Sequence, residues 1–226
     1  MELPSDAPTG QTADELLHRL RQREQLRFFE FQRQMRSLLA EIRAITRRSA
    51  LTPHSTDEFV AHLEGRIDAL ARVHGILMRL PDTKVDLAEL VSGEFLAHAI
   101  PENVIELGGP SVALSSKAAA SLALALHELT TNALKFGALS TPLGRLSVQW
   151  SRDVDDLRIV WLDWRERGVK ISEPPPTHKG FGLELIERTL PYELRARTAF
   201  EFKHDGVHCV IAFQPGVDLP GGEEKS

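Results

Sequence analysis

The side chains most suited to chemistry lie in one segment, residues 127–137, which reads His-Glu-Leu-Thr-Thr-Asn-Ala-Leu-Lys-Phe-Gly. Glu128, Asn132 and Lys135 are spaced four and three residues apart, so they share one face of a helix. A carboxylate, a carboxamide and an ammonium group on one face suit a magnesium ion and phosphate groups. The same spacing also fits a solvated polar stripe, and periodicity alone does not decide between the two.

Two further segments carry weaker signals. Residues 164–168 read Trp-Arg-Glu-Arg-Gly at the expected end of a strand, where Glu166 could accept a hydrogen bond from the exocyclic amine of a purine. An ordinary charged strand end is the alternative. Residues 179–183 read Lys-Gly-Phe-Gly-Leu directly before an expected helix. Gly180 and Gly182 would let backbone amides approach an anion, which a helix N-terminus favours, although many loops contain such a pair.

Two long helices are expected in the N-terminal third. Residues 14–49 contain neither proline nor glycine, which predicts one helix, and Ser55 or Thr56 can cap a second that ends near Pro81. The apolar positions of the first helix are Phe28, Phe31, Met35, Leu38, Ile42 and Ile45. Those of the second are Val60, Leu63, Ile67, Leu70, His74 and Leu77. Spacings of three and four residues are typical of a coiled-coil or bundle seam.

A hairpin of two such helices cannot close a core alone. Pairing with a second hairpin would give a four-helix bundle, so we expect a homodimer through residues 14–80. The alternative is that the helices pack on the C-terminal domain of their own chain.

The sequence pattern changes after Pro81, from two long helices to shorter helices and strands. Helices are expected at 87–99, 115–136 and 182–190, and strands at 103–107, 145–151, 157–164, 198–202 and 207–213. Strands and helices without strict alternation predict an α+β sandwich. The expected division is a disordered lead-in at 1–12, a helical hairpin at 13–82, the sandwich domain at 83–215 and a disordered tail at 216–226.

Bulk properties exclude several classes. The net charge of −5 gives no bulk signal for nucleic acid binding, and the single cysteine excludes an intramolecular disulfide. No apolar run approaches the roughly 20 residues that span a bilayer, and the N-terminus lacks the features of a signal peptide. We therefore expect a cytoplasmic protein with no membrane and no nucleic acid partner.

Taken together and in this order, the three segments resemble the ATP site of the superfamily that includes histidine kinases and gyrase. HELTTNALKFGAL, WRERG and GFGLELIERTL are more narrowly similar to the HWE-type histidine kinases, in which the asparagine segment begins with His-Glu and a Trp-x-Glu replaces the usual adenine motif. The resemblance covers roughly residues 25–215. It implies a dimerisation and phosphotransfer-like hairpin followed by a Bergerat-type α/β sandwich that binds ATP and Mg²⁺.

The resemblance also implies roles for single residues. Asn132 would hold magnesium and the phosphates, and Glu128 would orient water or metal or act as a base; these two form the catalytic and metal set. Lys135 would contact phosphate and Glu166 would read the adenine amine. The full ATP-binding set is His127, Glu128, Asn132, Lys135, Trp164, Glu166, Gly168, Gly180, Phe181 and Gly182, with Gly180 and Gly182 as lid hinge. His127 has no firm chemical role.

The phosphoacceptor of this family is absent. Counting back from the matching residues 38–45 places the acceptor histidine at Arg33. Arginine stays charged and cannot act as the nucleophile, so this position is non-functional as an acceptor. None of the other histidines considered is placed like residue 33: His18, His54, His62 and His74. Two further departures are Val169-Lys170 after Gly168 and a proline at 191 where glycine is common.

Two functions follow. In the first, the chain is a two-component signalling protein that binds Mg²⁺-ATP but is degenerate in autophosphorylation, and it regulates another histidine kinase or a response-regulator receiver domain. In the second, it is an active kinase that phosphorylates a non-standard residue or a partner. Between Arg19 and Arg48 lie nine arginines and three glutamates; this is either a solvated helix face or a docking surface for an acidic receiver domain.

Overall fold

The computed structural model describes residues 10–49, 55–79, 84–171 and 180–216. The chain divides into two compact units, Met1–Arg43 and Ala44–Ser226. This division places the second N-terminal helix in the same unit as the sheet. His54, Lys179, the first nine residues and nearly all of the expected tail lie outside the described residues.

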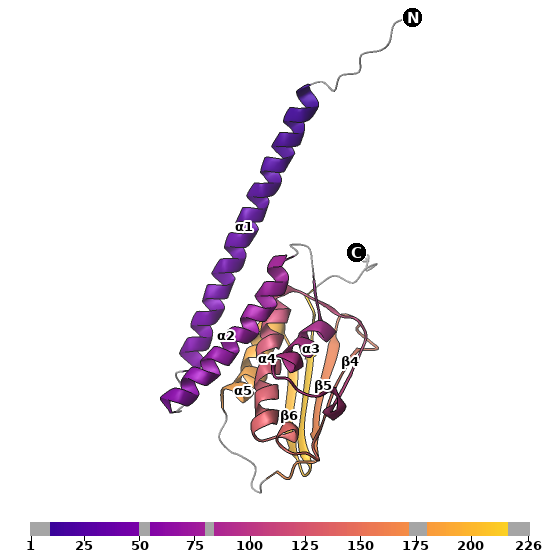
Figure 1. Ribbon diagram of the computed structural model, residues 1–226. Helices are drawn as coiled ribbons and strands as arrows, with labels where there is room; N and C mark the ends of the chain where they lie inside the picture. Colours follow the sequence, from indigo (N-terminus) through magenta and orange to yellow (C-terminus); the bar gives the residue numbers. More distant parts are fainter. Residues whose placement is uncertain (1–9, 50–54, 80–83, 172–179, 217–226) are drawn as a thin grey trace, which may run out of the picture. The chain divides into compact units, whose positions relative to one another are not determined.

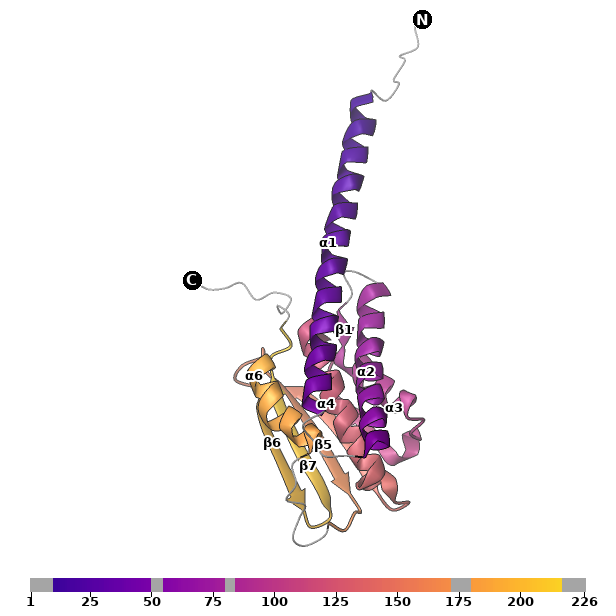
Figure 2. The ribbon, with the colours of Figure 1, turned by 90° about the vertical axis from the view of Figure 1, so that its left-hand side faces the viewer.

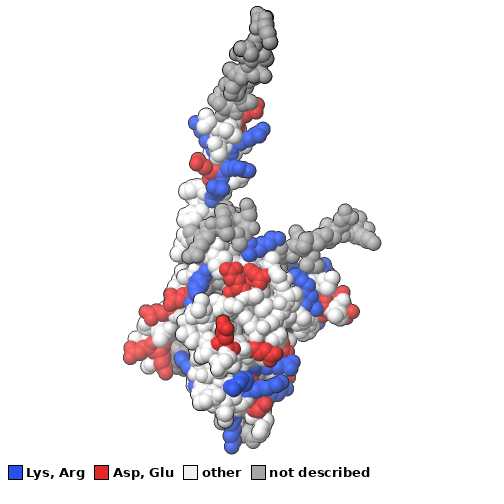
Figure 3. Space-filling view, turned by 45° about the vertical axis from the view of Figure 1, so that its right-hand side comes forward, with Lys and Arg blue, Asp and Glu red and all other residues white. Residues whose placement is uncertain are grey.

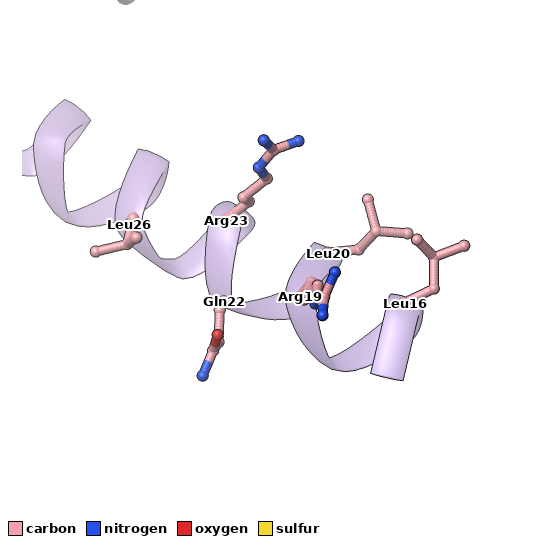
Figure 4. A pocket seen from close by; sticks show the side chains of 6 residues that line it. All are labelled: Leu16, Arg19, Leu20, Gln22, Arg23 and Leu26. Atoms are coloured by element: carbon pink, nitrogen blue, oxygen red, sulfur yellow. The ribbon is translucent and has the colours of Figure 1, made fainter. Parts of the chain in front are cut away.

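The first unit consists of most of helix α1, Gly10–Ser49. The helix begins at Gly10, so residues 10–12, expected in the lead-in, form its first turn. Large apolar side chains of this unit are exposed: Leu16, Leu17, Leu20, Leu26, Phe28, Phe29, Phe31 and Leu39. Figure 4 shows leucines and arginines of α1 around a shallow hollow lined by Leu16, Arg19, Leu20, Gln22, Arg23 and Leu26.

Basic side chains are more numerous than acidic ones on the part of α1 that Figure 3 shows, whereas the two signs are interspersed on the visible face of the second unit. Isolated exposed apolar residues are ordinary on protein surfaces, whereas these leucines and phenylalanines lie together along one helix. No helix among the described residues is both long enough and apolar enough to cross a membrane.

Helix α2, Thr56–Arg79, begins with a capping box. The backbone N–H of Glu58 donates to Ser55 Oγ (3.3 Å), and the N–H of Ser55 donates to Glu58 Oε2 (3.4 Å). Leu70, His74 and Leu77 of the predicted seam are buried. They are buried within one chain, because α2 packs against a helix of the sandwich. For α2 the structure therefore shows the alternative arrangement, packing on its own domain.

The second unit contains a five-stranded sheet in the order β2-β4-β5-β7-β6, in which only the β2–β4 pair is parallel, and a small antiparallel pair β1–β3. The strands are β1 (Val85–Asp86), β2 (Ile105–Gly108), β3 (Ala113–Leu114), β4 (Arg145–Arg152), β5 (Val160–Arg167), β6 (Arg197–Lys203) and β7 (Gly206–Phe213). The helical segments are α3 (Leu87–Ala97), η1 (Glu102–Val104), α4 (Ser116–Lys135), η2 (Ala138–Ser140), α5 (Phe181–Glu184), η3 (Leu185–Thr189) and α6 (Leu190–Leu194).

Helix α4 is the centre of the core. Ser115 caps it, since Ser115 Oγ accepts a hydrogen bond from the N–H of Ala118 (3.2 Å). The helix is buried nearly all round, as its Ala- and Leu-rich sequence predicts. It lies with α3 and the α5–α6 segment on one face of the sheet (Figures 1 and 2), and α2 covers it from outside. The predicted α+β sandwich is confirmed.

Several boundaries differ from the sequence prediction, and two of these differences lie next to the predicted site segments. Strand β5 begins at Val160 instead of Leu157, because Asp153 Oδ1 accepts hydrogen bonds from the N–H groups of Asp155 and Asp156 and closes a turn there. The strand continues to Arg167 and therefore includes Glu166. The helix expected at 182–190 runs from Phe181 to Leu194 with a π-helical turn in the middle.

Candidate functional site

All three predicted segments meet at the C-terminal half of α4. Gly182, of the glycine segment, lies against the asparagine segment: a Cβ there would be 3.0 Å from Glu128 Oε2 and 3.4 Å from Asn132 Nδ2. Glu166, of the tryptophan segment, accepts a hydrogen bond from the N–H of Ala138 (2.8 Å), just after α4. The structure thus brings together residues that are far apart in the sequence.

Glu166 lies in the core. The carboxylate also accepts a hydrogen bond from Trp164 Nε1 (3.0 Å), and both side chains are buried. Burial raises the pKa of Glu166 above its ordinary value, and the hydrogen bonds from Trp164 and Ala138 oppose that rise. Gly137 is required beside it, because a Cβ at residue 137 would overlap Glu166 Oε2. Gly168, just beyond β5, has a φ of 78°, which favours glycine.

Glu128 is buried and forms an ion pair with Arg66 of α2, with 2.6 Å between Oε1 and Nε. Arg66 is itself 3% exposed. Its guanidinium also donates to Ser49 Oγ at the end of α1 and lies over the ring of Phe181, 3.6 Å from the centroid. One arginine therefore contacts both the asparagine segment and the glycine segment.

Asn132 and Lys135 are exposed. Lys135 Nζ lies 3.0 Å from His62 Nε2 on α2. The polar face of α4 thus runs from a buried carboxylate to an exposed amide and ammonium. Gly180 caps α5, and a Cβ there would meet nothing within 4 Å.

His127 has a structural partner that the sequence did not reveal. Its Nδ1 lies 2.9 Å from Glu94 Oε1 on α3, and His98 Nε2 lies 2.9 Å from the same oxygen. The two imidazole rings stack with centroids 5.5 Å apart. Arg72 of α2 pairs with Glu94 Oε2. Glu94 thus links α2, α3 and α4.

The ligand atoms of Glu94, His98 and His127 lie within 4.8 Å of one another, a geometry that could hold a metal ion. Both carboxylate oxygens are already used, however, and the guanidinium of Arg72 beside them opposes a second cation. The cluster is better described as a charge network. Burial raises the pKa of Glu94, but the hydrogen bonds and charges of His127 and Arg72 outweigh it, and the net pKa is lowered.

Arg66 and Glu94 are the site residues that sequence reasoning missed. Each gives a signal: a charged residue on the apolar face of a helix. Arg66 follows Leu63 by three residues and precedes Leu70 by four, and Glu94 follows Val91 by three. A charge at such a position needs a buried partner, but the sequence does not name it.

Arg33, predicted to stand at the acceptor position, is exposed on α1 in the first unit. His18 is exposed on the same helix, and His74 is buried, as its place in the seam predicts.

Comparison with known proteins identifies the family. The family model described as HWE histidine kinase matches residues 30–111. Blue-light-activated histidine kinase 1 of Erythrobacter litoralis is 34% identical over 155 residues, which cover 67% of this chain and 42% of that protein. The chain belongs to the HWE histidine kinase family. The family match contains Arg33, Arg66 and Glu94 and ends before His127.

A second curated relative is also named a histidine kinase, and one solved structure shares the fold. Blue-light-activated histidine kinase of Brucella anthropi is 31% identical over 185 residues, covering 79% of this chain and 36% of that protein. The structure of the Erythrobacter litoralis EL346 blue-light activated histidine kinase shares the fold, with a TM-score of 0.57 at 16% identity over 81% of this chain and 59% of that chain. The chain spans about two fifths of the length of these two curated relatives.

The Glu94 network gives a pH-dependent prediction for this HWE-family chain. Glu94→Gln should lower the free energy of unfolding at pH 7 by about 2 kcal/mol, because His127 and partly exposed Arg72 lose their anionic partner. The lowered pKa of Glu94 means that its contribution is present above the ordinary value of 4.5 and is lost as the pH falls through the folded-state pKa.

Urea titrations of wild type and Glu94→Gln should therefore converge between pH 7 and pH 3. Glu89→Gln, on an exposed position of the same helix, is the matched control and should stay within about 0.5 kcal/mol of wild type. A Glu94→Gln difference that is constant over this pH range would contradict the network.

Proposed function

We propose that this chain is a two-component signalling protein that binds Mg²⁺-ATP on the C-terminal half of α4 and has lost self-phosphorylation at the usual position. The packing of Gly182 against Glu128 and Asn132 carries the proposal, because a glycine-rich helix start beside an acid and an amide suits a phosphate chain. ATP is supplied in the cytoplasm, so the proposal places the chain there.

The proposed roles divide between exposed and buried residues. Asn132 is exposed beside Gly182, and its amide oxygen is a ligand that Mg²⁺ accepts. Lys135 is exposed one turn further along, where it can contact phosphate. Glu166 is buried and both its oxygens accept hydrogen bonds, so it would accept one from the adenine amine only through a remaining lone pair and only when the site opens. Bound Mg²⁺ would neutralise charge on the phosphates during transfer.

Glu128 does not fit a metal in this conformation. Its carboxylate is 4% exposed and paired with Arg66. Asn132 and Lys135 are thus exposed in this conformation, whereas Glu128 becomes exposed only when Arg66 moves away.

The nucleotide proposal predicts that Asn132→Ala weakens binding of Mg²⁺ with a non-hydrolysable ATP analogue by at least about tenfold, because a metal ligand is lost. Isothermal titration calorimetry measures this. Asn103→Ala removes another exposed asparagine, on η1, and should bind as wild type does. Equal affinity of Asn132→Ala and wild type would remove the metal assignment, and a wild type that binds no analogue would remove the whole proposal.

The hypothesis of a degenerate kinase rests on residue 33. An exposed arginine there cannot accept a phosphoryl group. The alternative, an active kinase for a non-standard residue or a partner, draws on the convergence of all three segments. Stable label from γ-labelled ATP on wild type or on a co-purified partner would favour that alternative.

Restoring the acceptor separates the two. Arg33→His should gain acid-labile labelling from γ-labelled ATP, because the change supplies an imidazole nucleophile at the acceptor position. Arg36→His, also exposed on α1, is the matched control and should stay unlabelled. If Arg33→His stays unlabelled while still binding the ATP analogue, the catalytic part is itself incompetent and the loss lies beyond residue 33.

Self-association through residues 14–80 and docking of a receiver domain belong to the same proposal. Exposed Phe28 and Phe31 of α1 and the arginine-rich charge of this helix support them. Light scattering of the full chain should give twice 25.2 kDa, and Phe28→Glu should return a monomer. Phe202→Glu, on exposed β6, should stay dimeric. A monomeric wild type would overturn the dimer.

A further inference from the structure

We propose that α2 is a latch on the nucleotide site: its docking on α4 and the binding of Mg²⁺-ATP exclude one another, and Arg66 is the residue that couples them. This inference rests on the proposed function. It goes further by naming the element that regulates access and the groups that hold it.

The contacts of α2 follow the asparagine segment along α4. His62 lies at Lys135, Arg66 at Glu128, and Gly65 at His127. Further along α2, Arg72 reaches Glu94, the partner of His127. The ionisable groups of the segment are therefore held by α2 directly or through one residue. Asn132 and Lys135 stay exposed, although Lys135 is in contact with His62 of α2.

Arg66 restrains two parts of the site at once. It neutralises the carboxylate that would have to meet water or metal, and its guanidinium covers Phe181, which lies between the hinge glycines Gly180 and Gly182. Freeing Glu128 while Arg66 stays in place would leave an unpaired charge in the interior, which is strongly unfavourable. Glu128 is released at lower cost when α2 leaves and takes Arg66 into water.

Linkage makes this coupling reciprocal. If nucleotide binds only to the form in which α2 has left, nucleotide must loosen α2, and whatever loosens α2 must strengthen nucleotide binding by the same factor. The measured dissociation constant for nucleotide then equals the intrinsic constant of the unlatched form divided by the fraction of protein that is unlatched.

Gly65 offers a way to open the latch without touching a charge. A Cβ at this position would lie 2.6 Å from His127 Nε2. The imidazole cannot move aside freely, because it is buried, bonded to Glu94 and stacked on His98. Alanine at residue 65 should therefore wedge α2 away from α4 while keeping Arg66 and favouring helix. Gly75 of the same helix has nothing within 4 Å of such a Cβ and is the matched control.

The experiment compares wild type, Gly65→Ala and Gly75→Ala by calorimetry with Mg²⁺ and a non-hydrolysable ATP analogue. Gly65→Ala should bind about tenfold more tightly than wild type, and Gly75→Ala should equal wild type. Hydrogen exchange of the wild type supplies a second readout that needs no variant: the analogue should speed exchange in residues 56–79.

Each outcome supports or overturns the latch. If Gly65→Ala binds no more tightly than wild type, or if the analogue slows or leaves unchanged the exchange of residues 56–79, the latch is overturned and the nucleotide proposal stands. If neither wild type nor the two variants bind the analogue, both proposals fall. If circular dichroism shows that Gly65→Ala does not fold, the wild-type exchange experiment alone tests the latch.

Discussion

The buried ion pair between Arg66 and Glu128 is the interaction on which the rest of the arrangement depends. A carboxylate in the middle of an apolar helix cannot enter a core unless a cation comes with it. The cation is supplied from α2, 62 residues earlier in the sequence. Glu128 can therefore be buried only while α2 packs against α4. The same requirement explains why α2 belongs to the compact unit that contains the sheet.

The Glu94 network applies the same constraint to a carboxylate of α3. Glu94 is nearly as buried as Glu128, and it too takes its arginine from α2. Buried pairs of this kind add little net stability compared with apolar packing, but breaking one partner is costly, so they select one register of α2 over its neighbours. Two arginines six residues apart on α2, each with its own acid, fix both the rotation and the translation of this helix. His127, for which the resemblance implies no firm chemical role, has a structural one. It bonds Glu94 and directly precedes Glu128 on α4, so it lies between the two networks.

Local patterns predicted most elements and failed where the deciding contact is distant. The cap at Ser115, the apolar run of α4 and the capping box at Ser55 are encoded within a few residues, and the structure follows them. Strand β5 was displaced because three aspartates form a turn that competes with the strand. The placement of α2 could not be predicted, because its seam has the same spacing whether its partner is a second hairpin or α4. Arg66 lies beside that seam as a charged residue near apolar positions, but the sequence does not name its partner.

The fold constrains residue 33 much less than it constrains the three predicted site segments. Glu128, His127 and Glu166 are buried and bonded, so replacing any of them disturbs the fold itself. Residue 33 is exposed on a helix of another unit, where substitutions usually change the free energy of unfolding by about 0.5 kcal/mol or less. The fold alone therefore requires the buried residues of the site segments, whether or not residue 33 takes part in phosphoryl transfer. It follows that intact segments are weak evidence for autophosphorylation, and that exposed residues such as Asn132, which the fold does not require, are the better indicators of whether nucleotide is still bound.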